Sequence, residues 1–177
     1  IVPPEPPAMA TLTLGELPEN VTLVSVTTNG VEVVPVESAY TIYSNATATV
    51  TFAPAVGYRL VGNATVDVVM DTDKTLATAD MPTAGLIPSV TLTFPASLPE
   101  NVQLVSVVAN GTPIEAVNGV YTVLEGTEVT ITFAAADGYV LNESTVTLTL
   151  NENTVFPSES FPTVVDPTEL ISINEIM

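Results

Sequence analysis

The sequence predicts an all-β protein made of two tandem antiparallel β-sandwich domains. Three observations lead to this prediction: an internal repeat, an alternation of apolar and polar residues with a period of two, and turn dipeptides at short intervals. The chain has 177 residues, which is enough for two small domains that each bury a modest core. Its composition is 46% hydrophobic, unlike that of a disordered chain.

The repeat covers nearly the whole chain. LPENVTLVSVTTNG at 17–30 returns as LPENVQLVSVVANG at 98–111, 81 positions later. The match continues along both copies and, after a one-residue deletion, reaches MPT at 81–83 and FPT at 161–163. A repeat of this length predicts that each copy is one structural unit.

The repeat sets the expected domain boundaries. We expect a Pro-rich linker or N-terminal strand at 1–9, one sandwich at 10–85, a second sandwich at 86–164, and an apolar C-terminal tail at 165–177. The opening IVPPEPP is typical of a stiff, extended segment. AGLIP at 84–88 is too short for a flexible linker, so the two sandwiches are expected to form a semi-rigid rod.

Within each copy, apolar residues alternate with polar ones. ATATVTF at 46–52 places Ala, Ala, Val and Phe on one face and three Thr on the other. TEVTITF at 127–133 and STVTLTL at 144–150 alternate in the same way. Such alternation is typical of antiparallel strands with one buried and one solvated face. Val and Thr dominate these stretches, as expected for β-branched residues in a sheet.

Turn dipeptides separate the strands. Asn29-Gly30, Asn118-Gly119 and Asp137-Gly138 are typical of hairpins and tight turns. So many short strands within one repeat favour a small β-sandwich of immunoglobulin-like type, with a β-grasp-like or open-barrel module as the alternative. In the first copy the expected strands are 10–14, 20–28, 31–36, 39–43, 46–53, 58–62, 64–70 and 74–80.

A parity break interrupts the alternation after each LPEN. Leu23 and Val24 are adjacent apolar residues, and Leu104 and Val105 repeat the arrangement in the second copy. This break predicts either a β-bulge or a strand that is buried on both faces.

The stretch NGVYTVLEGTEVTITFAAADGYVL at 118–141, followed by a further strand and FPT, resembles the repeats of bacterial surface proteins. These are bacterial immunoglobulin-like and internalin-type B-repeat modules, with the pattern NG-x-Y-T-V, E-G-T-x-V-T-[IL]-T and a D-G-Y turn. The first copy keeps the frame but has Asn45 in place of Gly126 and Val56 in place of Asp137. The resemblance implies a secreted or cell-surface β-module that acts as a stalk, spacer or adhesin segment.

Charge and composition exclude several classes of function. Two basic residues stand against 20 acidic ones, which gives a formal net charge of −18. Binding to nucleic acids or to anionic membranes requires Lys and Arg, so neither is expected as a partner. No apolar run approaches the roughly 18 residues needed to cross a bilayer, so we expect no membrane insertion. The absence of Cys and His argues against zinc or copper sites and against cysteine or His-assisted serine nucleophiles.

The carboxylates are expected to form a solvated face. They fall mostly in turns and at outward strand positions, whereas catalysis by two carboxylates needs one acid in an apolar pocket. We therefore predict no catalytic residue, no cofactor and no enzymatic activity. Asp67, Asp71 and Asp73 in DVVMDTDK have the composition of a calcium loop, but the segment fails the EF-hand pattern. A plain hairpin turn is favoured there, with calcium binding as the alternative.

Five sequons are present, at Asn20, Asn45, Asn63, Asn110 and Asn142. A Thr-rich sequence generates such triplets by chance, but in an archaeal or eukaryotic source they would be glycan sites. A carbohydrate-binding role for the chain itself is disfavoured, because Trp is absent and the Tyr residues fall at repeated positions.

The sequence favours a non-enzymatic extracellular protein: a stalk, surface-layer or adhesin segment whose partners are neighbouring domains or identical subunits. A second hypothesis is a filament subunit in which Ile1–Pro7 or the C-terminal tail supplies a strand to its neighbour. The tail residues that would form such a donor strand are Leu170, Ile171, Ile173 and Ile176. The tail is alternatively the first strand of a following domain.

Overall fold

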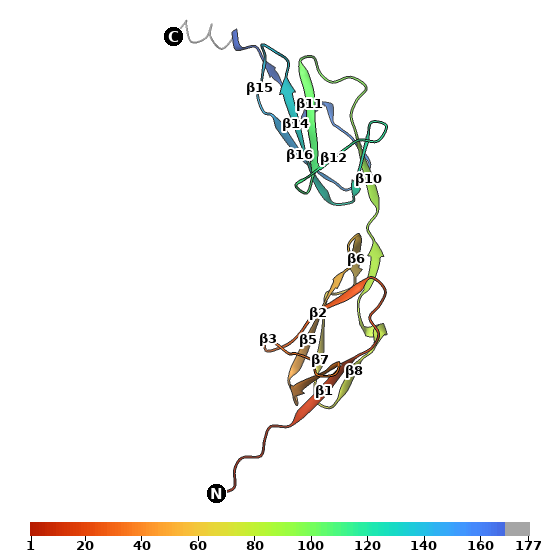
Figure 1. Cartoon of the computed structure of the whole chain (residues 1–177), viewed down its shortest axis with the longest axis vertical. Coiled ribbons are helices and arrows are strands. Elements are labelled where there is room, and N and C mark those ends of the chain that lie inside the picture. Colours follow the sequence, from red (N-terminus) through yellow and green to blue (C-terminus); the bar gives the residue numbers. More distant parts are fainter. Residues whose placement is uncertain (169–177) are drawn as a thin grey trace. The chain divides into compact units, whose positions relative to one another are not determined.

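The protein is built almost entirely from β-strands. The computed structural model describes residues 1–168, and the chain divides into a unit at Ile1–Ile87 and a unit that begins at Pro88 (Figure 1). This division lies two residues beyond the expected boundary at 85. Within residues 1–168, no helix has both the length and the apolar character that a bilayer crossing requires. The four residues of the expected donor strand, Leu170, Ile171, Ile173 and Ile176, lie outside the described part of the chain.

Unit 1 consists of two facing sheets and a short two-stranded ribbon. One sheet has the strand order β4-β1-β8, the other has the order β3-β2-β5-β7, and the ribbon is formed by β6 and β9. The elements are β1 (Met9–Leu14), β2 (Val21–Thr28), β3 (Val31–Glu32), β4 (Ala39–Tyr43), β5 (Thr47–Pro54), β6 (Tyr58–Val61), β7 (Thr65–Val69), β8 (Lys74–Leu76), the 3-10 turn η1 (Thr78–Asp80) and β9 (Thr83–Leu86).

Unit 2 repeats this arrangement strand for strand. Its sheets have the orders β13-β10-β17 and β12-β11-β14-β16, and its ribbon is formed by β15 and β18. The elements are β10 (Ser89–Thr93), β11 (Val102–Ala109), β12 (Thr112–Ile114), β13 (Val120–Leu124), β14 (Thr127–Ala135), β15 (Val140–Leu141), β16 (Thr145–Leu150), β17 (Thr154–Val155), the 3-10 turn η2 (Ser158–Ser160) and β18 (Val164–Val165).

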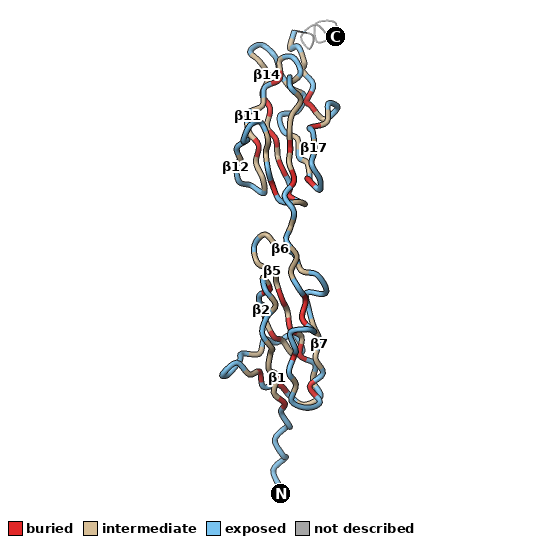
Figure 2. The backbone as a smooth tube through the Cα atoms, turned by 90° about the vertical axis from the view of Figure 1, so that its right-hand side faces the viewer, coloured by how far each residue is buried: buried red, intermediate tan, exposed pale blue. Residues whose placement is uncertain are grey.

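The core of each unit lies between its two larger sheets. In unit 1, Leu12 and Ile42 from one sheet pack in a single buried cluster with Val26 and Val50 from the other. Figure 2 shows the buried positions, in red, spaced along the strands, while the turns are exposed. Burial on alternate residues is what the sequence predicted, and the all-β sandwich class is confirmed.

The two cores differ in their aromatic content. Unit 2 contains a cluster in which the Phe156 ring lies 4.6 Å from that of Phe161, 5.2 Å from that of Phe94 and 5.6 Å from that of Phe133. Three of these rings stand where unit 1 has aliphatic side chains: Leu14, Leu76 and Met81 align with Phe94, Phe156 and Phe161. Unit 1 therefore has smaller, non-aromatic side chains at these positions, of which Met81 is the most flexible.

A β-bulge accounts for the parity break. The pairing of β2 with β5 passes from Leu23 to Ser25, and Val24, with 56% of its surface exposed, has no partner in that register. The pairing of β11 with β14 shifts at Val105 in the same way. Of the two alternatives that the sequence left open, the bulge is confirmed.

Several sequence-based expectations need correction at the level of strand pairing. One pair in each unit is parallel rather than antiparallel: β1 with β8, and β10 with β17. The expected strand 74–80 ends at Leu76 and gives way to η1. AGLIP is not only a connection, because its first residues belong to β9, which pairs with β6.

Candidate functional site

The carboxylates face solvent, as the sequence indicated. Every Asp and Glu in residues 1–168 is exposed, except Glu125, which is half-buried. In that part of the chain, Thr127 is the only buried polar residue. None of the acids in residues 1–168 therefore lies in the kind of apolar pocket that raises the pKa of a catalytic carboxyl group.

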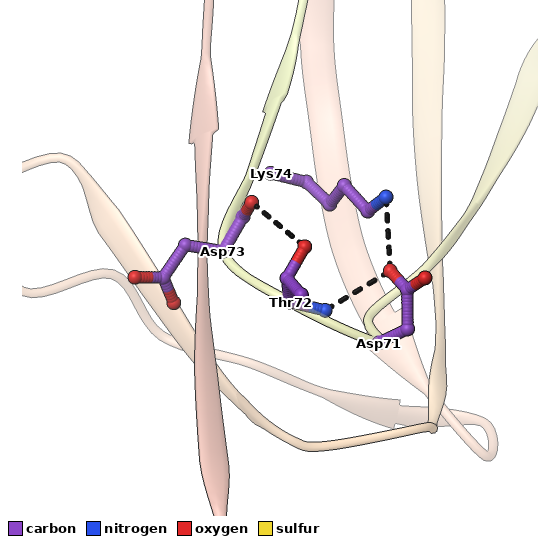
Figure 3. A network of polar contacts seen from close by, with 4 residues as sticks. All are labelled: Asp71, Thr72, Asp73 and Lys74. Carbon is purple, nitrogen blue, oxygen red and sulfur yellow. Dashed lines mark hydrogen bonds and ion pairs between the residues drawn. The ribbon is translucent and has the colours of Figure 1, made fainter.

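A local network of polar contacts lies in the turn between β7 and β8 (Figure 3). Lys74 Nζ lies 2.9 Å from Asp71 Oδ1, and the backbone N–H of Thr72 donates to the same oxygen at 3.0 Å. The Thr72 hydroxyl donates to the Asp73 carbonyl at 3.4 Å. The hydrogen bond from Lys74, followed by its charge, lowers the pKa of the Asp71 carboxyl below its ordinary value. The pair is exposed, so it stabilises the turn only slightly.

Asp73 has a different role from its neighbour. Its side chain points away from Asp71 (Figure 3), and its Oδ1 accepts a hydrogen bond from the backbone N–H of Thr11 at 2.8 Å. Unit 2 contains the same contact with an amide: Asn153 Oδ1 accepts from the backbone N–H of Thr91 at 2.9 Å. A side-chain oxygen at this position thus extends the pairing of the first strand with the last strand of its sheet in both units.

The calcium candidates are not brought together into one ligand set. Asp67 lies on β7, where its Oδ1 accepts a hydrogen bond from the Thr49 hydroxyl at 2.7 Å. Each of the three carboxylates therefore contacts a different partner: the Thr49 hydroxyl, the Lys74 ammonium group or the backbone N–H of Thr11. Within residues 1–168, no group of three or more His, Cys, Asp or Glu side chains is placed to hold a metal ion.

A shallow groove runs between β7 and β8. It encloses about 370 Å³ and is lined by Asp67, Asp71, Lys74 and Asp80 together with apolar residues of both strands. The positions aligned with Asp67, Asp71 and Lys74 in unit 2 are Thr147, Asn151 and Thr154, which are neutral. The charge in this groove is thus a property of unit 1 and not of the repeated fold.

The parallel contact between β1 and β8 is a row of hydrogen bonds that the sequence did not reveal. We call it the β1–β8 seam and define it as residues 11–16 with residues 73–78. Besides the register from Leu12↔Lys74 to Leu14↔Leu76, it contains four contacts in a row. These are Thr11 N to Asp73 Oδ1 at 2.8 Å, Thr13 Oγ1 with Thr75 Oγ1 at 2.9 Å, Gly15 N to Leu76 O at 2.8 Å, and Thr78 Oγ1 to Glu16 O at 2.6 Å.

A side chain at Gly15 would be crowded at the end of this seam. A Cβ at this position would lie 3.1 Å from both the nitrogen and the hydroxyl oxygen of Thr78, and 3.2 Å from the Leu76 carbonyl oxygen. Thr11-Leu12-Thr13 is repeated as Thr91-Leu92-Thr93, which indicates that the strand recurs in the second copy but not which strand it pairs with.

The five sequon asparagines lie in turns and loops outside the strands. Asn45, Asn63, Asn110 and Asn142 are exposed, and Asn20 is half-buried. Asn142 is already engaged, because its Oδ1 accepts a hydrogen bond from the backbone N–H of Thr163 at 2.7 Å. Glycosylation at these positions stays a prediction.

Comparisons with known proteins place the chain in no family. No protein-family model matches it, and no curated protein matches it. Among solved structures, the Bacillus anthracis TIE protein is 13% identical with a TM-score of 0.27; the match covers 83% of this chain and 32% of the TIE protein chain. The chain thus spans about a third of the length of that protein, and a similarity of this degree assigns neither fold nor function.

Proposed function

We propose that the chain is a non-enzymatic structural module of an extracellular protein: a stalk, surface-layer or adhesin segment. The observation that supports this role best is the use of polar side chains at equivalent positions. Asp73 and Asn153 both hold the first strand of a sheet to its last strand. Asp73 is charged and Asn153 is neutral, yet both make the same contact. The contact therefore depends on the side-chain oxygen and not on the charge, and its role is to stabilise the fold.

The distribution of charge supports the same role. The formal net charge is −18, and within residues 1–168 every acid except Glu125 is exposed. Such a surface favours solubility in a chain with 46% hydrophobic residues and repels other acidic molecules. Such a surface suits a spacer, whose task is to hold other parts of a protein apart.

Surface labelling of the producing cells tests this role. An antibody raised against residues 1–168 is expected to label intact cells, and brief protease treatment of those cells should remove the label. Labelling that appears only after permeabilisation would refute the extracellular assignment.

A filament subunit is the second candidate, supported by the N-terminal segment. Ile1–Pro7 precedes β1, belongs to no strand and is exposed, with fully exposed apolar side chains at Ile1 and Val2. An extended segment can pair with the edge of a neighbouring sheet, although here four prolines lack the N–H that such pairing uses, so the pairing would rest on the other three residues. Light scattering on the full chain, on a chain lacking residues 1–7 and on one lacking residues 165–177 separates the two candidates. A monomer in all three samples would exclude the filament role.

A further inference from the structure

The β1–β8 seam joins the two ends of the unit 1 sandwich in a geometry suited to tension. Because the two strands are parallel, the start of β1 and the end of β8 lie at opposite ends of the seam. Within unit 1, Figure 1 shows the segment before β1 at one end of the unit and the β6–β9 ribbon, through which the chain leaves, at the other. A pull on the two ends of the unit therefore draws β1 and β8 in opposite directions along their axes.

The direction of the pull determines whether the hydrogen bonds between β1 and β8 break together or one after another. Hydrogen bonds between parallel strands that are pulled apart along their length carry the load together, because none can open before its neighbours. Strands that are pulled from the same end open one bond at a time. In the seam, the contacts from Thr11 N–Asp73 Oδ1 to Thr78 Oγ1–Glu16 O lie in a continuous row and would share the load. The buried side chains of Leu12 and Leu76 anchor both strands to the core.

We propose that the β1–β8 seam is a force-bearing joint that makes unit 1 more resistant to tension than unit 2. This inference rests on the proposed spacer role, in which the module transmits force between the parts that it separates. It adds to that role a specific set of bonds and a difference between the two units.

Unit 2 lacks two of the seam's contacts for reasons of residue type. Val155 stands where unit 1 has Thr75, so no hydroxyl faces Thr93 across the pair. Pro95 stands where unit 1 has Gly15, and proline has no N–H to donate to the carbonyl of the facing strand. The pairing of β10 with β17 covers two residue pairs, whereas that of β1 with β8 covers three.

Constant-force spectroscopy on the full chain, tethered at its two ends, tests the proposal. Two unfolding steps are expected, and the slower one belongs to unit 1. Thr75→Val, which copies the residue of unit 2, should raise the rate of the slower step about fivefold, the factor expected for the loss of one side-chain hydrogen bond. Val155→Thr, which restores a hydroxyl opposite Thr93, should lower the rate of the faster step. Because each variant changes one unit, the pair also assigns the steps.

Thr49→Val is the matched control. It makes the same chemical change on β5, where it removes the hydroxyl bond to Asp67, which is outside the seam. Its unfolding rate under force should match that of the parent, and thermal melting should show that all variants are folded. The proposal is overturned if Thr75→Val leaves the slower step unchanged, if it acts on the faster step, or if Thr49→Val raises the rate as much. Surface labelling tests the extracellular role separately from the force measurement. If labelling refuted that role, the measured difference in unfolding rate between the two units would still hold.

Discussion

At the scale of single residues, backbone conformation explains why asparagine is common in the turns. Within residues 1–168, eight residues other than glycine have a positive φ, and six of them are asparagines. Asn tolerates this left-handed region because its short polar side chain can bond locally. The other two are Glu37 (φ 50°) and Ser38 (φ 68°), which occupy the turn that Asn118 and Gly119 form in unit 2.

Replacing this turn is expected to stabilise unit 1. Both turns are two-residue hairpins, closed by mutual backbone hydrogen bonds between Val36 and Ala39 and between Val117 and Val120. Asn-Gly is the preferred pair where two successive residues need positive φ. The double change Glu37→Asn with Ser38→Gly should therefore raise the free energy of unfolding of unit 1 by about 1–2 kcal/mol. Urea unfolding followed by NMR signals of unit 1 measures the change.

The reverse exchange is the control for this prediction. Asn118→Glu with Gly119→Ser places the unfavourable pair in unit 2 and should lower the stability of that unit by a similar amount, since Gly119 has a φ of 79°. Two exchanges that both stabilise, or both destabilise, would show that the φ angles are not the cause.

At the scale of elements, the bulge shows how a strand can carry an extra residue without losing its register. Val21, Leu23 and Val26 face the core, while Thr22 and Ser25 face outward, so the alternation is regular once Val24 is left out. The extra residue bends the strand and increases its twist. Its side chain is exposed, so it adds little to the core.

Deletion of Val24 is therefore expected to be tolerated. Leu23 and Ser25 would become neighbours in a regular ladder, and the free energy of unfolding should stay within about 1 kcal/mol of the parent value. Deletion of Thr49 from β5 is the contrasting case, because that strand has no bulged residue. The residues on one side of the deletion would shift by one position, and their apolar side chains would then face solvent. Circular dichroism and thermal melting measure both. Equal loss of structure in the two deletions would contradict this account of the bulge.

The strands were predictable from the sequence, but their partners were not. Alternation in ATATVTF located β5 and its buried residues Ala48, Val50 and Phe52, because the period of two follows directly from the pleat. The same period appears in parallel and antiparallel strands, so it could not indicate that β1 pairs with β8. Nor did it locate β9, where TAGL has no alternating pattern.

The polar contacts were less predictable than the strands. Asp71 and Asp73 are two residues apart in a turn and read as one acidic cluster, yet the structure directs one to Lys74 and the other to the backbone of Thr11. That second contact joins residues 62 positions apart in the chain, and no local pattern reports such a distance. Thr13 and Thr75 read as ordinary outward-facing strand residues for the same reason.

At the scale of the whole molecule, each unit has a core of its own. Among residues 1–168, the buried cluster of unit 1 ends at Met81, with Ala84 packed against it, and that of unit 2 begins at Val90. Since the hydrophobic contacts that drive folding are complete within each unit, neither depends on the other for its core.

Each unit is therefore expected to fold alone. Fragments 1–87 and 88–177 should each unfold cooperatively with a free energy of about 4–13 kcal/mol, the range usual for domains of this size. Amide NMR spectra of the two fragments, overlaid on that of the full chain, test this directly. Poorly dispersed amide signals in either fragment would contradict the prediction.

The different cores of the two units have a consequence during synthesis. Tandem domains with nearly the same strands are prone to misassembly, in which a strand of one copy enters the sheet of the other. An exchange of β8 for the β17 segment would bring Phe156 into the place of Leu76, and an exchange after η1 would bring Phe161 into the place of Met81. Each would crowd a core that is packed for smaller side chains. We therefore expect the aliphatic and aromatic cores to disfavour such exchanges during folding.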